Sequence, residues 1–179
     1  ENSNRLIGPP LPETIRTLYG IEEPEDTVIE NKFREYYTDK GIFENRVYNG
    51  IPEALNGLRE KGFSLFVATS KPQFMAEKVL SHFHLSDFFD GIVGATRDLQ
   101  LVKKDDIIRE LLTRYNLLPQ NTLMVGDRKY DMIGSNRCGV LPIGAAWGYG
   151  SITELLSANA MFILDEPSQM PDFLGRLAF

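Results

Sequence analysis

Short apolar segments alternate with helical patterns from about residue 47 to the end of the chain, and this alternation strongly limits the possible folds. The segments expected to be strands are 63–68, 91–94, 123–125, 140–143 and 161–164. The expected helices span 52–61, 72–83, 104–115, 131–137, 153–157 and 167–177. Strands that alternate with helices of this length form right-handed βαβ units on a parallel sheet. We therefore expect an α/β fold, with segment 63–68 apolar enough to be buried on both faces of the sheet.

Residues 1–45 have a different pattern and are expected to be entirely helical. Prolines between positions 9 and 12 stand where a helix begins, and Gly20 stands where it ends. A second helix is expected at 25–40. The length of 179 residues and the hydrophobic content of 42% suffice for one well-packed domain, expected at 46–179, with a small appendage.

The composition excludes several classes of partner. The formal net charge of −6 argues against nucleic acid, because nucleic-acid binding depends on basic patches that release counterions. No apolar run approaches the roughly 20 residues that span a bilayer, and the polar start of the chain is unlike a signal peptide. The single cysteine, Cys138, rules out an internal disulfide and fits a reducing cytosol. We expect a cytoplasmic protein in which Cys138 is a small packing residue, while the oligomeric state stays open.

Two carboxylates follow the apolar segment 123–125. Gly126 and Asp127 come directly after it, and Asp131 follows four residues after Asp127. Ligands of open α/β sheets bind where the strands end, so Asp127 is expected at a binding site. Carboxylate oxygens suit Mg²⁺, which keeps several of its waters. The alternative is an Asp-rich turn in which Asp131 caps the next helix.

A second polar segment follows the predicted strand 63–68. It contains Thr69, Ser70 and Lys71 and leads to a helix start at Pro72. Hydroxyl groups and free backbone amides at such a position can hold a phosphate.

Two lysines, Lys103 and Lys104, lie at the start of another predicted helix, where a basic residue opposes the helix dipole. That cost is easier to explain if one lysine binds an anion, although Lys103 is better explained as a surface residue. The ends of parallel strands share one edge of the sheet, so the hydroxyls, a lysine and the carboxylate pair together predict a site for phosphate and Mg²⁺.

With these motifs in this order, the chain resembles the haloacid dehalogenase-like hydrolases, in the branch of phosphoglycolate phosphatases and related small-molecule phosphatases. The matching parts are residues 7–11, 66–72 and 88–94, the lysine Lys104 with Lys103 as the alternative register, Gly126-Asp127 with Asp131, and residues 143–150. The resemblance implies a Rossmann-like, doubly wound parallel sheet with a small helical cap. Residues 1–45 would be part of that cap, and 46–179 would be the core.

The resemblance also implies a function, a Mg²⁺-dependent phosphatase that hydrolyses a small phosphomonoester such as phosphoglycolate or a nucleotide. Thr69 and Ser70 would bind the phosphoryl group, and Lys104 would neutralise its charge. Asp127 would ligate Mg²⁺. Asp131 would orient the site or join the outer shell of the metal.

The first motif of the family, Asp-x-Asp-Gly-Thr on a strand upstream of the cap, is absent from the sequence. In the family, its first Asp attacks phosphorus to form an aspartyl-phosphate, and its second acts as general acid and base. Asp87 and Asp90 have the wrong spacing to replace this pair. We expect a segment upstream of Glu1 to supply the nucleophile and its strand. Without it the chain should be inactive and should fold poorly, because the sheet would have a gap with unpaired backbone groups.

Two other functions stay open. A non-catalytic module lacking the nucleophile would be stabilised by a phospho-ligand or a protein partner without turnover. A phosphomutase or pyrophosphatase of the same superfamily would share the core motifs, because substrate choice lies largely in the cap.

Several other polar and aromatic residues are expected to be structural. His82 and His84 are not needed by a carboxylate site for Mg²⁺. Trp147 and Tyr149 are interpreted as packing residues. Arg128 is left open between contact with an anion and a solvated position.

Overall fold

The computed structural model describes residues 40–96 and 100–177, together with Gly20, Val28, residues 31–32 and residues 35–38. The chain divides into two compact units, Glu1–Arg46 and Val47–Phe179. In the first unit the short 3₁₀ helix η2 spans Gly41–Phe43. The expected helix that ends at Gly20 lies outside the described residues, and the one expected at 25–40 is described only in part.

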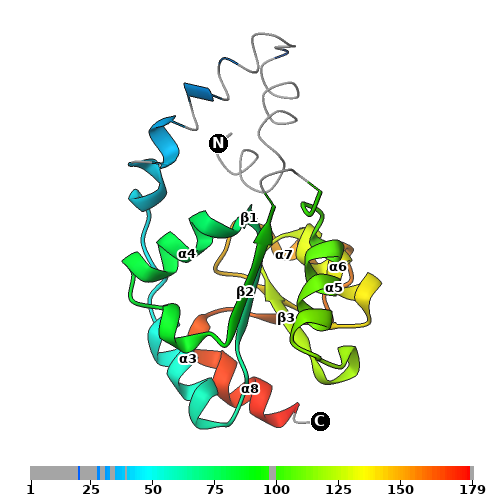
Figure 1. Ribbon diagram of the computed structural model, residues 1–179. Coiled ribbons are helices and arrows are strands. Elements are labelled where there is room, and N and C mark those ends of the chain that lie inside the picture. Colours follow the sequence, from blue (N-terminus) through cyan, green and yellow to red (C-terminus); the bar gives the residue numbers. More distant parts are fainter. Residues whose placement is uncertain are drawn as a thin grey trace. The chain divides into compact units, whose positions relative to one another are not determined.

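The second unit alternates strands and helices along the chain, as the sequence predicts (Figure 1). Its strands are β1 (Phe66–Pro72), β2 (Gly91–Ala95), β3 (Leu123–Gly126), β4 (Leu141–Ala145) and β5 (Phe162–Leu164). Its α-helices are α3 (Ile51–Glu60), α4 (Gln73–His82), α5 (Lys104–Arg114), α6 (Lys129–Cys138), α7 (Ile152–Ser157) and α8 (Met170–Arg176). Short 3₁₀ helices are η3 (Ser86–Phe88), η4 (Pro119–Asn121) and η5 (Pro167–Gln169). None of the helices in the described part of the chain is long and apolar enough to cross a membrane.

The strands form two parallel groups rather than one continuous sheet. β1 pairs with β2, with Phe66 opposite Gly91. β4 lies between β3 and β5 and pairs with both in parallel. Within residues 40–96 and 100–177, no hydrogen-bonded ladder joins β1 to β3. The expected α/β fold with parallel strands is confirmed. In the described structure, β1 and β3 each have one edge without a strand partner.

Helix α5 connects the two groups of strands. It packs against β1 and β2, and also against α6, which in turn packs on β3 and β4 (Figure 1). Ile108 and Leu112 of α5 form a buried cluster with Val140, and Ala68 of β1 and Met124 of β3 pack against that cluster. The two groups are therefore held together by side-chain packing around α5.

A second core lies where α3 and α8 pack on each other. Leu58 and Leu174 from these helices are buried with Ile143 of β4 and Leu164 of β5. Burying a leucine or isoleucine side chain is worth about 1.5–3 kcal/mol, so this cluster ties the ends of the second unit to the β3–β4–β5 group.

The strand β1 differs most from its predicted bounds, since it begins at Phe66 rather than at residue 63 and continues to Pro72. The residue before it, Leu65, donates its N–H to the Asp90 carboxylate over 2.8 Å, so the ladder with β2 begins only at the next residue. The expected burial of this strand on both faces is wrong, because no residue of β1 is fully buried and none of β3 is, whereas four of the five residues of β4 are. The other predicted bounds agree with the structure to within about two residues, except that η5 precedes the last helix.

Candidate functional site at the strand ends

Lys104 is the point where three elements of the candidate site meet. Its Nζ lies 2.8 Å from Asp131 Oδ1 and donates a hydrogen bond to the carbonyl oxygen of Ala68 over 3.0 Å. Lys104 begins α5, Ala68 belongs to β1 and Asp131 lies in the first turn of α6. Only 12% of the lysine side chain and 8% of the aspartate side chain are exposed, so water screens this ion pair weakly.

Both oxygens of the Asp131 carboxylate have partners. Oδ2 accepts the backbone N–H of Arg128 over 3.0 Å, which is the helix-capping role considered for this residue, while Oδ1 faces Lys104. Gly126 is needed beside it, because a Cβ at that position would lie 2.3 Å from Asp131 Cβ. Asp131 is thus placed to orient the lysine.

Asp127 follows β3 and is held by the loop after β4. Its Oδ2 accepts the N–H of Tyr149 over 2.8 Å, and its backbone carbonyl accepts the N–H of Gly150 over 2.9 Å. A Cβ on Gly148 would lie 2.1 Å from Asp127 Cβ and 2.4 Å from Oδ2, so only glycine fits there without movement. One carboxylate oxygen of Asp127 is thereby fixed by the backbone, and no described residue hydrogen-bonds the other, Oδ1.

Thr69 and Ser70 lie near the carboxyl end of β1, next to Ala68. Thr69 Oγ1 accepts the N–H of Lys71 over 3.1 Å, which leaves the hydroxyl proton able to donate to a ligand. Ser70 is exposed. The pairing with β2 is irregular between Thr69 and Pro72, so the chain leaves the regular ladder at these hydroxyls.

The donor set fits a hard cation only in part. Within the described residues no group of three or more His, Cys, Asp or Glu side chains comes together as a metal site. Asp127 offers a carboxylate oxygen, the ligand type that Mg²⁺ takes, and Mg²⁺ is commonly bound through one or two carboxylates with waters and substrate phosphate completing its shell. Asp127 therefore suits the role of one Mg²⁺ ligand, and the other ligands of the ion would come from elsewhere.

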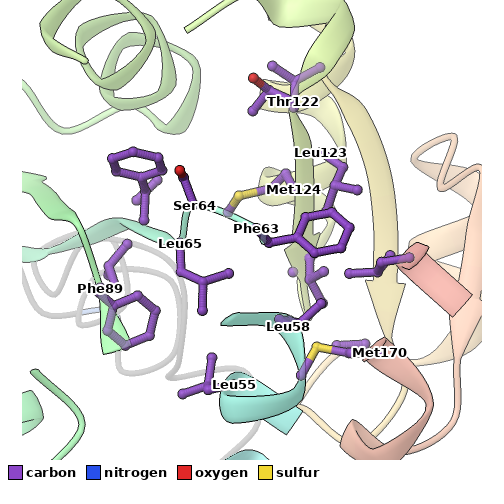
Figure 2. A pocket seen from close by; sticks show the side chains of 18 of the residues that line it. Leu55, Leu58, Phe63, Ser64, Leu65, Phe89, Thr122, Leu123, Met124 and Met170 are labelled. Atoms are coloured by element: carbon purple, nitrogen blue, oxygen red, sulfur yellow. The ribbon is translucent and has the colours of Figure 1, made fainter. Parts of the chain in front are cut away.

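A cavity of about 760 Å³ lies between β1 and β3 (Figure 2). Its walls include Val67 and Ala68 of β1, Met124 and Val125 of β3, and Asp127 at the end of β3. The labelled side chains around it in Figure 2 are mostly apolar and come from several elements: Leu55, Leu58, Phe63, Ser64, Leu65, Phe89, Thr122, Leu123, Met124 and Met170. Small-molecule pockets have a similar volume, but polar groups converge in them. This cavity differs because it is mostly apolar and is bounded by the edges of two strands.

Other residues considered from the sequence have structural surroundings. The Cys138 thiol donates to the carbonyl of Asp105 over 3.3 Å, and partial burial raises its pKa, which suppresses thiolate reactivity. His82 stacks edge-on against Phe83, and His84 is exposed in a turn with positive φ. Trp147 packs against the cluster around Ile143 and also lines the cavity.

Sequence reasoning missed Glu154, in the first turn of α7. Its Oε1 accepts hydrogen bonds from Arg128 Nε over 3.0 Å and from the backbone N–H of Lys129 over 2.9 Å. Arg128 is therefore neither solvated nor free for a substrate in this structure. Partial burial of Glu154 acts to raise its pKa, but the two hydrogen bonds and the nearby positive charges outweigh that effect and hold the pKa below its usual range. Only the tertiary fold reveals this contact, since the partners are 25 and 26 residues apart.

The fold and the position of these polar groups define a class, the Rossmann-like α/β proteins that bind ligands at the carboxyl ends of parallel strands. A model of the haloacid dehalogenase-like hydrolase family matches residues 1–145. The chain belongs to this family.

Curated relatives agree with this assignment. The chain is 40% identical over 150 residues to a 5′-nucleotidase of Pseudomonas aeruginosa, covering 84% of the chain and 68% of the relative. It is 34% identical to the tyrosine-protein kinase PtkA of Mycobacterium tuberculosis, covering 83% of the chain but only 50% of PtkA. A phosphoglycolate phosphatase of Haemophilus influenzae is 27% identical, with 84% of the chain and 67% of the relative covered. The chain thus spans between half and about two thirds of these proteins.

A solved structure shows the same fold. A predicted phosphatase from Clostridium acetobutylicum superposes with a TM-score of 0.89 and 38% identity, over 96% of this chain and 79% of that one. The family, its phosphoglycolate phosphatase-like branch, the Rossmann-like fold and the enzyme class expected from the sequence are all confirmed.

Proposed function

We propose that this chain forms the core of a Mg²⁺-dependent phosphatase that hydrolyses a small phosphomonoester of the phosphoglycolate or nucleotide type. The single observation that carries this proposal is the meeting of Lys104 with Asp131 and with Ala68 of β1, the residue before Thr69. The names of the relatives, a 5′-nucleotidase and a phosphoglycolate phosphatase, support the substrate class.

Lys104 and Thr69 are proposed to bind the phosphoryl group. The lysine ammonium is held in place by Asp131 and Ala68, so it can offer its charge to an anion without first being ordered. The Thr69 hydroxyl keeps its proton for donation, and Ser70 offers a second hydroxyl at the same strand end. Asp131 acts on the reaction through Lys104.

Asp127 is proposed to ligate Mg²⁺ through the oxygen that Tyr149 does not bond. When bound there, Mg²⁺ would supply a positive charge that neutralises the transferring phosphoryl oxygens. The chain itself contributes an oriented carboxylate, because the backbone of the 148–150 loop fixes Asp127 in one position.

The nucleophile is proposed to come from a further strand, on a segment upstream of Glu1, that fills the cavity between β1 and β3. Two observations support this: each of these strands lacks a partner on one edge in the described structure, and the cavity between them is lined mainly by core side chains. Unpaired strand edges are templates for another strand. A parallel strand in this cavity would end beside Asp127, which lines it.

An aspartate at the end of that strand would attack phosphorus with a carboxylate oxygen. The bond from phosphorus to the ester oxygen breaks, and the leaving alcohol takes a proton from a neighbouring acid. Water then attacks the phosphorus of the aspartyl-phosphate and gives a proton to the same neighbouring residue, now a base. The bond from phosphorus to the aspartate oxygen breaks, which releases inorganic phosphate and restores the carboxylate. The first unit, Glu1–Arg46, is proposed to be part of a cap that excludes water and contributes to substrate choice.

The test is phosphate release by the native full-length protein with a panel of phosphomonoesters, with and without Mg²⁺. We expect Mg²⁺-dependent release that Asp127→Ala abolishes. Asp172→Ala is the matched control, because that side chain is 78% exposed in a weak surface pair with Lys61. Wild-type rates in Asp127→Ala, or ligand binding without any release, would contradict the proposal; the second result would favour a non-catalytic binding module.

A further inference from the structure

Glu154 connects the Asp127 loop to helix α7. One oxygen of its carboxylate, Oε1, accepts both the Arg128 guanidinium Nε and the Lys129 backbone N–H. The Glu154 N–H is in turn held by the hydroxyl of Ser151, the residue that precedes α7. The carboxylate therefore binds the two residues that follow Asp127 to a fixed helix start.

The same stretch of chain also contacts Asp127 itself. Tyr149 N–H bonds the Asp127 carboxylate and Gly150 N–H bonds its carbonyl oxygen; these two residues lie five and four positions before Glu154 in the sequence. A Cβ on Gly150 would lie 2.2 Å from that carbonyl oxygen and 3.4 Å from Glu154 Oε1, so the two segments are in close contact. Asp127 and the two residues that follow it are thus held by the 149–154 segment.

The negative charge of Glu154 strengthens its contact with Arg128. The side chains of Arg128 and Glu154 are only 14% and 25% exposed, so their ion pair is partly shielded from water. A hydrogen bond between charged groups is roughly twice as strong as one between neutral groups. A neutral side chain at position 154 would hold the loop less firmly.

We propose that Glu154 is a positioning residue that fixes the Asp127 carboxylate through Arg128 and Lys129, and so sets how tightly the site binds a divalent cation. This inference rests on the proposed role of Asp127 as a Mg²⁺ ligand. Residues that orient metal ligands typically change metal affinity by 10–100-fold when they are replaced. Glu154 does not touch the metal or the substrate in this account.

The test measures Mg²⁺ binding directly, by titration calorimetry on the native full-length protein without substrate. Glu154→Ala is expected to weaken the Kd for Mg²⁺ about ten-fold or more. Glu154→Gln keeps an acceptor for Lys129 N–H and should lie between Glu154→Ala and the wild type. The control is Glu110→Gln, which breaks an exposed pair with Arg114 on α5 and should leave the Kd unchanged.

Kinetics provide a second readout that a simple loss of stability does not imitate. In Glu154→Gln the Mg²⁺ concentration for half-maximal activity should rise, while the KM for substrate at saturating Mg²⁺ stays at the wild-type value. If Glu154→Ala fails to fold, Glu154→Gln and Arg128→Met carry the same test. Wild-type Mg²⁺ affinity in these variants, with binding lost in Asp127→Ala, overturns this inference alone. Wild-type Mg²⁺ affinity in Asp127→Ala overturns the metal site itself.

Discussion

Lys104 Nζ and Asp131 Oδ1 lie 2.8 Å apart, and they join two groups of strands between which the described residues form no strand pairing. The lysine also bonds the carbonyl oxygen of Ala68 in β1, while Asp131 lies on the helix that follows β3. A single ammonium group therefore links the two groups of strands at the edge where the candidate site lies.

Replacing Lys104 by methionine should destabilise the protein by about 3 kcal/mol, because it leaves the buried Asp131 carboxylate without its cation. Urea unfolding of the native full-length protein measures the change. Lys61→Met is the control: its pair with Asp172 spans 3.4 Å at the surface and should contribute at most about 1 kcal/mol. Equal losses of stability in the two variants would show that the ion pair of Lys104 stabilises the fold no more than an exposed pair does.

Replacing Thr69 by valine should lower kcat/KM about a hundred-fold, since it removes the hydroxyl that we propose donates to the phosphoryl group. Thr69→Ser keeps the hydroxyl and should retain most of the activity. Thr113→Val, at an exposed position on α5, controls for the valine itself. The role given to Thr69 fails if serine and valine at this position reduce turnover equally.

Gly148→Ala should displace the Asp127 side chain, because the added methyl would lie 2.1 Å from Asp127 Cβ. We expect a loss of about 1–3 kcal/mol in the free energy of unfolding and a larger requirement for Mg²⁺. Gly175→Ala is the matched control, since its added methyl would meet only the flexible Lys61 side chain, at 3.2 Å. Calorimetric Mg²⁺ titration compares the two variants, and equal Mg²⁺ affinities would contradict this prediction.

The pH dependence of stability should report on Glu154. Its pKa is lowered in the folded protein, so the folded state binds this proton more weakly than the unfolded chain does. The resulting stabilisation is fully present above the ordinary glutamate pKa of about 4.3 and is lost as the pH falls through the lower folded pKa. The stability advantage of the wild type over Glu154→Gln should therefore be constant near neutral pH and shrink below about pH 4.3. An advantage that does not change on acidification would contradict the charged role of Glu154.

Much of the fold could be predicted from the sequence because the second unit follows local rules. Apolar runs such as 123–125 and the helical apolar spacing of 104–115 each specify their element, and their alternation specifies the parallel arrangement. The start of β1 could not be predicted locally, since Leu65 is held by the side chain of Asp90, which lies just before β2. The partial burial of β1 depends on what packs at the edge that does not pair with β2. The local sequence of the strand carries no information about that neighbour.

The sequence singles out the residue types of the candidate site but not the contacts that hold them in place. Strand-end position singled out Asp127 and Asp131, and the structure brings Lys104 rather than Lys103 to Asp131. Helix geometry explains this choice, because Lys103 precedes the helix and is exposed, whereas Lys104 begins it. The contacts of Glu154 and the close approach of Gly148 to Asp127 arise only when segments more than 20 residues apart in sequence fold onto each other.

We propose that the nucleophilic aspartate lies on a strand between β1 and β3, supplied from outside residues 1–179. The most direct test is to trap the phosphoenzyme of the native full-length protein during Mg²⁺-dependent turnover, reduce the acyl phosphate with borohydride and map the modified aspartate by peptide mass spectrometry. We expect one modified aspartate, on a peptide upstream of Glu1. Modification of Asp127 or Asp131, or turnover without any modified aspartate, would contradict it.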